Sequence, residues 1–304
     1  MSAGTENRTM AALAAILGYA ILIGFTDNFV RVIAADGGLW QFNFMRTAIA
    51  VVVFALAMVP FALRLRPVSL PAVVARSIVH GSALLIYFGC LAFMSVAQAA
   101  AGLFTAPIWV LLIARFVYGH ALGPARIVAV AVGFLGVVLV LAPGEDAALG
   151  WASLLPVVAG MLYALGNIAT REWCAQESAA TLTLGFFLAL GAAGLAGLLV
   201  LALVPQLPAE GADGFILRGW VVPSASFWLW TAVNAVGSML GVGLMVRAYQ
   251  MAEASRVSIF EYVILPVSAL WSWVLWGEVI TMVAALGIVM IVAAGATIAA
   301  RAPG

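Results

Sequence analysis

Ten apolar runs of about 20 residues, separated by short polar breaks, fill almost the whole chain. A helix needs about 20 residues to cross the roughly 30 Å hydrocarbon core of a bilayer, so each run is long enough for one crossing. The composition agrees with this interpretation, since 66% of the residues are hydrophobic and only 8% are charged. A soluble chain of 304 residues could not cover its surface with polar groups at that composition.

The runs are continuous rather than alternating, which favours helices over the strands of a membrane β-barrel. The sequence therefore predicts an all-α polytopic membrane protein with ten transmembrane helices. The first run contains Asp27 and Arg31 and lacks a small-residue cleavage site, so we interpret it as a retained span rather than as a signal peptide. The predicted spans are residues 11–34, 40–63, 73–94, 98–118, 125–142, 152–173, 181–204, 226–248, 255–276 and 280–299.

The arginines indicate the orientation of these spans. The chain has no lysine, and when its loops are assigned alternately to two sides, one side holds only Arg31 and Arg218. By the positive-inside rule the arginine-rich side is cytoplasmic, so both termini are predicted to lie in the cytoplasm of a bacterial cell, at its inner membrane. The arginine-rich side collects Arg8, Arg64, Arg66, Arg76, Arg115, Arg126, Arg171, Arg247, Arg256 and Arg301.

Several function classes lack their residues in this sequence. Without lysine there is no Walker lysine and no Schiff base, and the chain has neither an H-E-x-x-H nor a G-x-S-x-G motif. Cys90 and Cys174 do not have the spacing of metal ligands. The net charge of +1 does not indicate a nucleic-acid partner. We therefore expect a protein that is not an enzyme, without cofactor or metal, whose partners are a small-molecule substrate and membrane lipid, and which is monomeric.

The two halves of the chain resemble each other. Pro107 in the fourth span is followed by Gly119-His120, and Pro266 in the ninth span is followed at a similar distance by Gly277-Glu278. Duplication of a five-helix unit would give two copies, residues 1–146 and 147–304, and because five is odd the copies would enter the membrane from opposite sides. Inverted repeats of this kind are typical of secondary transporters, which bind substrate near the midplane.

Particular residues resemble a known family. They are the stretch from Pro266 through Trp276-Gly277-Glu278-Val279 to Gly287, the step at residues 92–97 that ends in Ser95-Val96-Ala97, and Arg46 early in the second span. Together with the ten-span layout they resemble the drug/metabolite transporter superfamily, EamA type, and within it the YddG-type exporters of aromatic and other hydrophobic amino acids. The chain departs from the family pattern at His120, where an acidic residue is usual. The resemblance implies a transporter.

Charged residues inside the predicted spans need a partner or water, because an ionisable group at membrane depth is costly. Asp27 and Arg46 lie at similar depth on consecutive spans, as either a structural ion pair or an outer gate. Glu261 lies at the depth of Arg115 and Arg247, as either a static inner pair or a gating or proton-carrying carboxylate.

Neutral polar and aromatic residues at mid-depth predict a cavity with aromatic walls, although each alone could serve helix packing. Pro107 and Pro266 are predicted to break their helices beside it. The candidate cavity residues are Asn43, His80, Tyr87, Thr105, Trp109, Tyr163, Asn167, Asn234, Ser258, Glu261 and Tyr262.

We therefore expect a secondary transporter that exports small organic solutes by alternating access, with rocking of spans three, four, eight and nine. The first substrate hypothesis is aromatic or hydrophobic amino acids. The alternative is a broad-specificity exporter of drugs or cationic metabolites, in which Glu261 would attract the cation. A channel or a non-transporting membrane scaffold is the alternative from another class.

Overall fold

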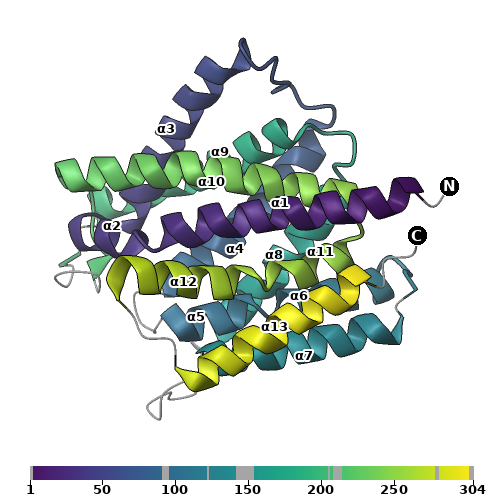
Figure 1. Cartoon of the computed structure of the whole chain (residues 1–304). Coiled ribbons are helices and arrows are strands. Elements are labelled where there is room, and N and C mark those ends of the chain that lie inside the picture. Colours follow the sequence, from purple (N-terminus) through teal and green to yellow (C-terminus); the bar gives the residue numbers. More distant parts are fainter. Residues whose placement is uncertain are drawn as a thin grey trace.

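A computed structural model of the chain describes residues 3–90, 96–121, 123–141, 154–204, 206–207, 214–277 and 281–300. These residues form a bundle of α-helices (Figure 1). The helices are α1 (Ala3–Asp27), α2 (Val30–Asp36), α3 (Leu39–Met58), α4 (Leu70–Cys90), α5 (Val96–Leu103), α6 (Ala106–Phe116), α7 (Pro124–Leu141), α8 (Leu155–Glu172), α9 (Ala179–Leu203), α10 (Ala225–Met251), α11 (Ala254–Glu261), α12 (Ile264–Trp276) and α13 (Met282–Ala300).

The protein is an all-helical membrane protein, as its apolar runs predict. Among the described residues, 6 helical segments are long and apolar enough to cross a bilayer, and shorter apolar helices accompany them. Each predicted span coincides with one helix or with two consecutive helices. The count of ten crossings and the inverted repeat stay predictions, and the predicted boundary between the repeats falls within residues 142–153, outside the described residues.

Three of the predicted spans are broken into two helices each. The first breaks between α1 and α2 at Asn28 and Phe29, the fourth between α5 and α6, and the ninth between α11 and α12. In the fourth and ninth, the break lies just before Pro107 and Pro266. A proline ring collides with the carbonyl four residues earlier and offers no N–H, so the helix cannot continue unbroken through it.

Glycines bring the helices of the two halves together. The most extensive helix contacts are α7 with α13, α1 with α10, α3 with α9, and α4 with α8. A Cβ atom on Gly194 of α9 would lie 2.7 Å from the carbonyl oxygen of Trp40 in α3, and one on Gly136 of α7 would lie 2.7 Å from that of Gly287 in α13. Only glycine allows such close approach of two backbones, as is common between membrane helices.

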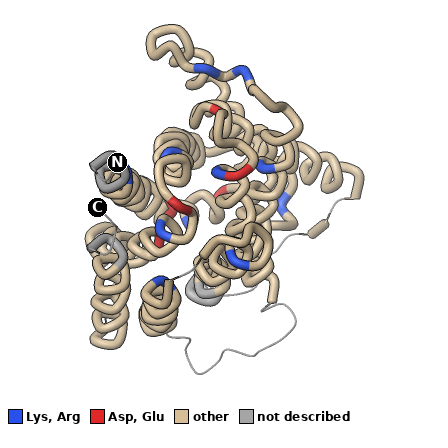
Figure 2. The backbone as a smooth tube through the Cα atoms, turned by 90° about the vertical axis from the view of Figure 1, so that its right-hand side faces the viewer, with Lys and Arg blue, Asp and Glu red and all other residues tan. Residues whose placement is uncertain are grey.

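The two ends of the bundle differ. Helix α1 begins and α13 ends on the same side of the molecule, at the right of Figure 1, while α2 lies at the other side. We call these sides the terminal face and the opposite face. The terminal face carries the α6–α7, α8–α9 and α10–α11 loops, and Figure 2 looks onto it. Which face is cytoplasmic stays a prediction.

Candidate functional site

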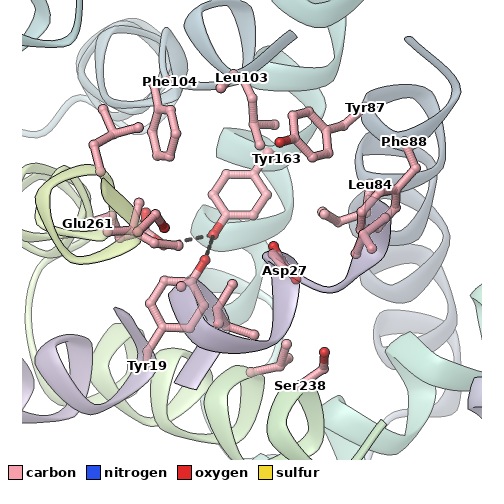
Figure 3. Close-up of a pocket in the computed structure, with 18 of the residues that line it drawn as sticks. Tyr19, Asp27, Leu84, Tyr87, Phe88, Leu103, Phe104, Tyr163, Ser238 and Glu261 are labelled. Atoms are coloured by element: carbon pink, nitrogen blue, oxygen red, sulfur yellow. Dashed lines mark hydrogen bonds between the residues drawn. The ribbon is translucent and has the colours of Figure 1, made fainter. Parts of the chain in front are cut away.

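A cavity of about 540 Å³ lies at the centre of the bundle, between helices of both halves (Figure 3). Its lining runs from α2 and the segment around Phe215, at the opposite face, to His80, Tyr163 and Glu261. Toward the terminal face the lining ends at those residues. The described lining residues are Tyr19, Ile23, Gly24, Asp27, Asn28, Val30, Arg31, Ala34, Arg46, His80, Leu84, Tyr87, Phe88, Ala100, Leu103, Phe104, Ala106, Pro107, Tyr163, Phe186, Phe215, Ser238, Val242, Met245, Glu261, Ile264, Leu265, Ser268, Ala269 and Ser272.

Two helical faces supply much of the polar lining. On α1 and α2, Tyr19, Asp27 and Arg31 recur at intervals of four or eight residues. Residues so spaced lie on one face of a helix. On α11 and α12, Glu261, Ser268 and Ser272 recur in a similar way, at intervals of seven and four residues. The breaks between α1 and α2 and between α11 and α12 both fall within the stretches that line the cavity.

Glu261 accepts hydrogen bonds from three described side chains. It is 4% exposed. Its Oε1 accepts a hydrogen bond from the Tyr163 hydroxyl at 2.8 Å, and its Oε2 accepts from the Tyr249 hydroxyl at 2.6 Å and from Asn167 Nδ2 at 3.4 Å. The Tyr19 and Tyr163 hydroxyl oxygens lie 3.2 Å apart, which extends the network to α1. All these partners are neutral.

The prediction of an inner ion pair between Glu261 and Arg115 or Arg247 is wrong. Among the described residues, neither arginine contacts this carboxylate, and both side chains are exposed. Arg115 lies in the last turn of α6. Long arginine side chains near a helix end turn toward water, where the guanidinium stays hydrated.

Asp27 and Arg46 are joined through Asn234. Arg46 Nη1 donates to Asn234 Oδ1 at 3.1 Å, and the Asn234 side chain also neighbours the Asp27 carboxylate. The Arg46 guanidinium lies 5.1 Å and 5.2 Å from the ring centres of Phe42 and Phe187. No direct ion pair joins Asp27 to Arg46 in the described part of the chain, because the amide stands between them.

Aromatic side chains form the walls of the cavity. The rings of His80 and Tyr163 lie 4.8 Å apart, and His80 also meets the Phe186 ring edge-on at 5.4 Å. Figure 3 shows Phe104, from the break between α5 and α6, and Tyr87, from α4, facing the same space. The cavity therefore combines apolar, aromatic walls with two carboxylates and two arginines.

The cavity brings together part of the predicted site. Of the predicted residues, His80, Tyr87, Tyr163, Glu261, Asp27, Arg46 and Pro107 line it. Asn167 and Asn234 lie behind the lining residues. Asn167 hydrogen-bonds to Glu261, and Asn234 hydrogen-bonds to Arg46. Trp109 Nε1 donates a hydrogen bond to Thr105 Oγ1 at 3.1 Å, and neither residue belongs to the cavity lining.

The other predicted residues lie away from the cavity surface. Asn43 Nδ2 donates to the Leu39 carbonyl at 2.9 Å, within its own helix. Tyr262 sits at the α11–α12 break and packs against Gly133 of α7. Ser258 is fully buried, and Pro266 is partly buried outside the lining.

Sequence reasoning missed Tyr19, Ser268 and Ser272 as lining residues. A signal for them exists, because each lies on the helical face of a charged residue that was singled out. Tyr19 precedes Asp27 by eight residues, and the two serines follow Glu261 by seven and eleven residues. Extending the helical periodicity from each charged residue would have found them.

A second group of polar contacts closes the terminal face, and we call it the terminal latch. Glu253 Oε2 pairs with Arg126 and lies 3.7 Å from Arg256 Nε. Arg126 Nη1 also donates to Ser255 Oγ at 2.9 Å, and Arg171 donates to the Ala252 carbonyl. These contacts tie the start of α7 and the end of α8 to the α10–α11 loop. Within the described residues, no group of His, Cys, Asp and Glu could hold a metal ion.

Comparison with known proteins gives both sequence and structural relatives. Residues 10–142 match the EamA-like transporter family. A riboflavin transporter from Rhizobium johnstonii is 29% identical over 187 residues, 62% of this chain and 56% of that protein. The chain thus spans just over half the length of the riboflavin transporters it matches. The pseudopaline exporter CntI from Pseudomonas aeruginosa is 22% identical over 281 residues, 90% of this chain and 92% of that exporter.

A solved crystal structure shares the fold. It superposes with a TM-score of 0.72 at 19% sequence identity, over 96% of this chain and 97% of the other. At that identity the likeness concerns the arrangement of helices alone.

Proposed function

We propose that the chain is a secondary transporter of the drug/metabolite transporter superfamily that moves small organic molecules by alternating access. The match of residues 10–142 to the EamA-like transporter family supports this proposal. The matched family and the relatives reported above are transporters, which supports a membrane transport protein rather than an enzyme. In this proposal it lies in a bacterial inner membrane with the terminal face toward the cytoplasm.

The observation that carries the proposal is the central cavity. Its lining reaches the opposite face at Ala34 and Phe215 but stops at Tyr163 and Glu261 on the other side. Beyond that floor lies the terminal latch. A cavity that approaches one face and is closed from the other is the arrangement expected of one state of an alternating-access carrier.

The packing of the helices supports an inverted repeat. If the first five predicted spans correspond in order to the last five, α1 with α10 and α8 with α4 are equivalent pairs, and both are extensive. The pairs α3–α9 and α7–α13 each map onto themselves. A pseudo-twofold axis between the halves would produce such exchange. The two proline breaks, in α5–α6 and α11–α12, are then also equivalent positions.

The lining supports a small amphiphilic substrate. The aromatic walls suit a planar or apolar group, and the balanced charges of Asp27, Glu261, Arg31 and Arg46 suit a zwitterion. Aromatic and hydrophobic amino acids fit this description, and they are the first substrate class we propose. The names of the relatives make riboflavin a second compound to test.

A second candidate is export of cationic drugs or metabolites. The observation that favours it is Glu261, a buried carboxylate whose described partners carry no positive charge. This candidate shares the cavity and the carrier mechanism and differs in the substrate.

Counterflow in proteoliposomes tests the proposal. Vesicles loaded with unlabelled phenylalanine, tryptophan, riboflavin or a cationic dye should accumulate the labelled compound transiently, in a saturable manner, with and without a pH gradient. A channel would give flux without saturation or counterflow, and a scaffold would give none; either result would refute the carrier. Proteoliposomes made with heat-unfolded protein give the background accumulation.

A further inference from the structure

We propose that Glu261 and the tyrosines around it form a binding site for a protonated amine, so that the substrate enters with its ammonium group toward the terminal face. This inference rests on the proposed transport function and names the chemical group that the cavity selects. The groups that face the carboxylate come from α1, α8 and α10, and they are Tyr19, Tyr163, Asn167, Tyr249 and Met245.

The first step is the charge. A carboxylate at the centre of a membrane protein is stable only if a cation, or enough hydrogen-bond donors and water, compensates it. Around Glu261 the described residues supply hydrogen bonds but no arginine or histidine contact. The donors hold the carboxylate in place and leave its negative charge for a cation that arrives through the cavity.

The second step is the geometry of the two oxygens. Among the residues that the structure describes, Oε2 accepts from both Tyr249 and Asn167, whereas Oε1 accepts from Tyr163 alone. A carboxylate oxygen has two lone pairs, so Oε1 keeps one for a further donor. Glu261 lines the cavity, which places that acceptor within reach of a bound molecule. A ligand that carries at least one N–H can use this acceptor, which favours a primary, secondary or tertiary ammonium over a quaternary one.

The third step is the aromatic surround. Figure 3 shows Tyr19, Tyr163 and Phe104 on the sides of the space in front of Glu261. Aromatic rings around a carboxylate attract ammonium groups through their negative faces. The Tyr163 and Tyr249 hydroxyls donate their hydrogens to Glu261, so they are not available to an oxyanion.

The fourth step is the asymmetry of the cavity. Its two arginines, Arg31 and Arg46, lie nearer the opposite face, on α2 and α3. The Arg31 guanidinium lies 3.9 Å from the ring centre of Trp276. An amine at Glu261 therefore leaves the anionic or neutral remainder of the molecule on the side of the arginines, which fixes its orientation.

The test compares an amine with its neutral isostere. Binding of phenethylamine and of 2-phenylethanol is measured by isothermal titration on detergent-solubilised protein near pH 7. The wild-type protein is expected to bind the amine at least tenfold more tightly. Equal affinities, or binding of neither compound, would overturn the proposal without any variant being needed.

Two variants assign the effect to the carboxylate. Glu261→Gln keeps the size of the side chain, removes the charge and replaces one acceptor oxygen by an amide donor. It should abolish the preference for the amine. Tyr163→Phe removes one hydrogen bond and keeps the charge, so the preference should persist. A Glu261→Gln protein that still prefers the amine would refute the assignment. If that variant does not fold, Glu261→Asp, which retains the charge, should keep the preference; losing it would count against the site.

A proton is the other cation that Glu261 could bind, and transport measurements distinguish a proton site from an amine site. If Glu261→Gln removes stimulation by a pH gradient but leaves the preference for the amine, Glu261 is a proton site and the inference is wrong. If no compound is transported but the amine preference depends on Glu261, the transport proposal fails while the amine site stands. If transport occurs without any amine preference, the amine site is wrong while the transport proposal stands.

Discussion

Glu253 is the centre of the terminal latch, and replacing it should open the terminal face. Its carboxylate pairs with Arg126 at the start of α7 and with Arg256 at the start of α11, so it joins helices from the two halves of the chain. Glu253→Gln keeps the shape of the side chain and removes both ionic contacts. We expect the variant to spend more time with the terminal face open.

The size of the effect follows from exposure. The Glu253 side chain is 48% exposed, while those of Arg126 and Arg256 are 17% and 15% exposed. Solvent screens such pairs, and each is worth about 0.5–1 kcal/mol. Glu253 and Arg256 are three residues apart in one segment, so only the pair with Arg126 joins parts that separate on opening. That pair gives about 0.5–1 kcal/mol, which corresponds to a shift of roughly 2- to 5-fold in the ratio of open to closed protein, since 1.4 kcal/mol is about tenfold.

A native cysteine reports this opening. Cys174 lies in the α8–α9 loop beside the latch and is 1% exposed. Burial raises the pKa of its thiol to about 11, although the nearby Arg76 opposes the shift. Near neutral pH the closed state therefore holds almost no reactive thiolate. Exposure returns the pKa toward its ordinary value, so labelling follows the open fraction and should accelerate as pH rises.

The measurement is the rate of maleimide labelling in detergent, with Cys90 replaced by alanine so that Cys174 is the single cysteine. Glu253→Gln should raise the rate about 2- to 5-fold. Glu172→Gln is the matched control, because Glu172 lies 4.0 Å from His120 in a partly exposed pair, and it should change the rate less than about twofold. An unchanged rate in Glu253→Gln would show that the latch does not hold the terminal face closed.

Three further predictions concern other parts of the structure. Arg46→Gln loses the hydrogen bond from the guanidinium to Asn234 that ties α3 to α10, and it should lower the rate of export about tenfold without loss of folded protein; unaltered export kinetics would refute a role in gating. Gly197→Val should lower the free energy of unfolding by about 1–3 kcal/mol, because a Cβ there would lie 2.1 Å from the Trp40 ring. Gly295→Ala, with nothing within 4 Å, should leave the thermal midpoint unchanged as a control. Glu177→Gln should cost about 1–2 kcal/mol in a denaturation experiment, since its carboxylate accepts hydrogen bonds from two backbone amides at the start of α4; equal stability would contradict that cap.

The sequence predicted the membrane fold because hydrophobicity acts locally. A run of about 20 apolar residues must form its own hydrogen bonds in lipid, and a helix is the structure that does so within one segment. The breaks near Pro107 and Pro266 were predictable for a similar reason, since the ring excludes a regular helix wherever it occurs.

The partners of the charged residues were decided by the tertiary structure. Depth along a span can be counted from the sequence, and it placed Glu261 near Arg115 and Arg247. It gives no information about the direction in which a side chain points around its helix. The packing of α8 and α10 turned two tyrosines and an asparagine toward Glu261, while both arginines face outward.

Arg76 illustrates the same limit. It was assigned to the arginine-rich loops, but it lies inside α4 with 0% exposure, where its Nε donates to Thr170 Oγ1 at 2.9 Å. The amino-acid sequence by itself determined that the chain crosses a membrane as helices and that two of them break beside Pro107 and Pro266, because these properties follow from each segment's own hydrophobicity and backbone chemistry. Only the tertiary structure decided which polar groups meet in the central cavity and which close the terminal face, because those contacts depend on how helices distant in the sequence rotate and pack against one another.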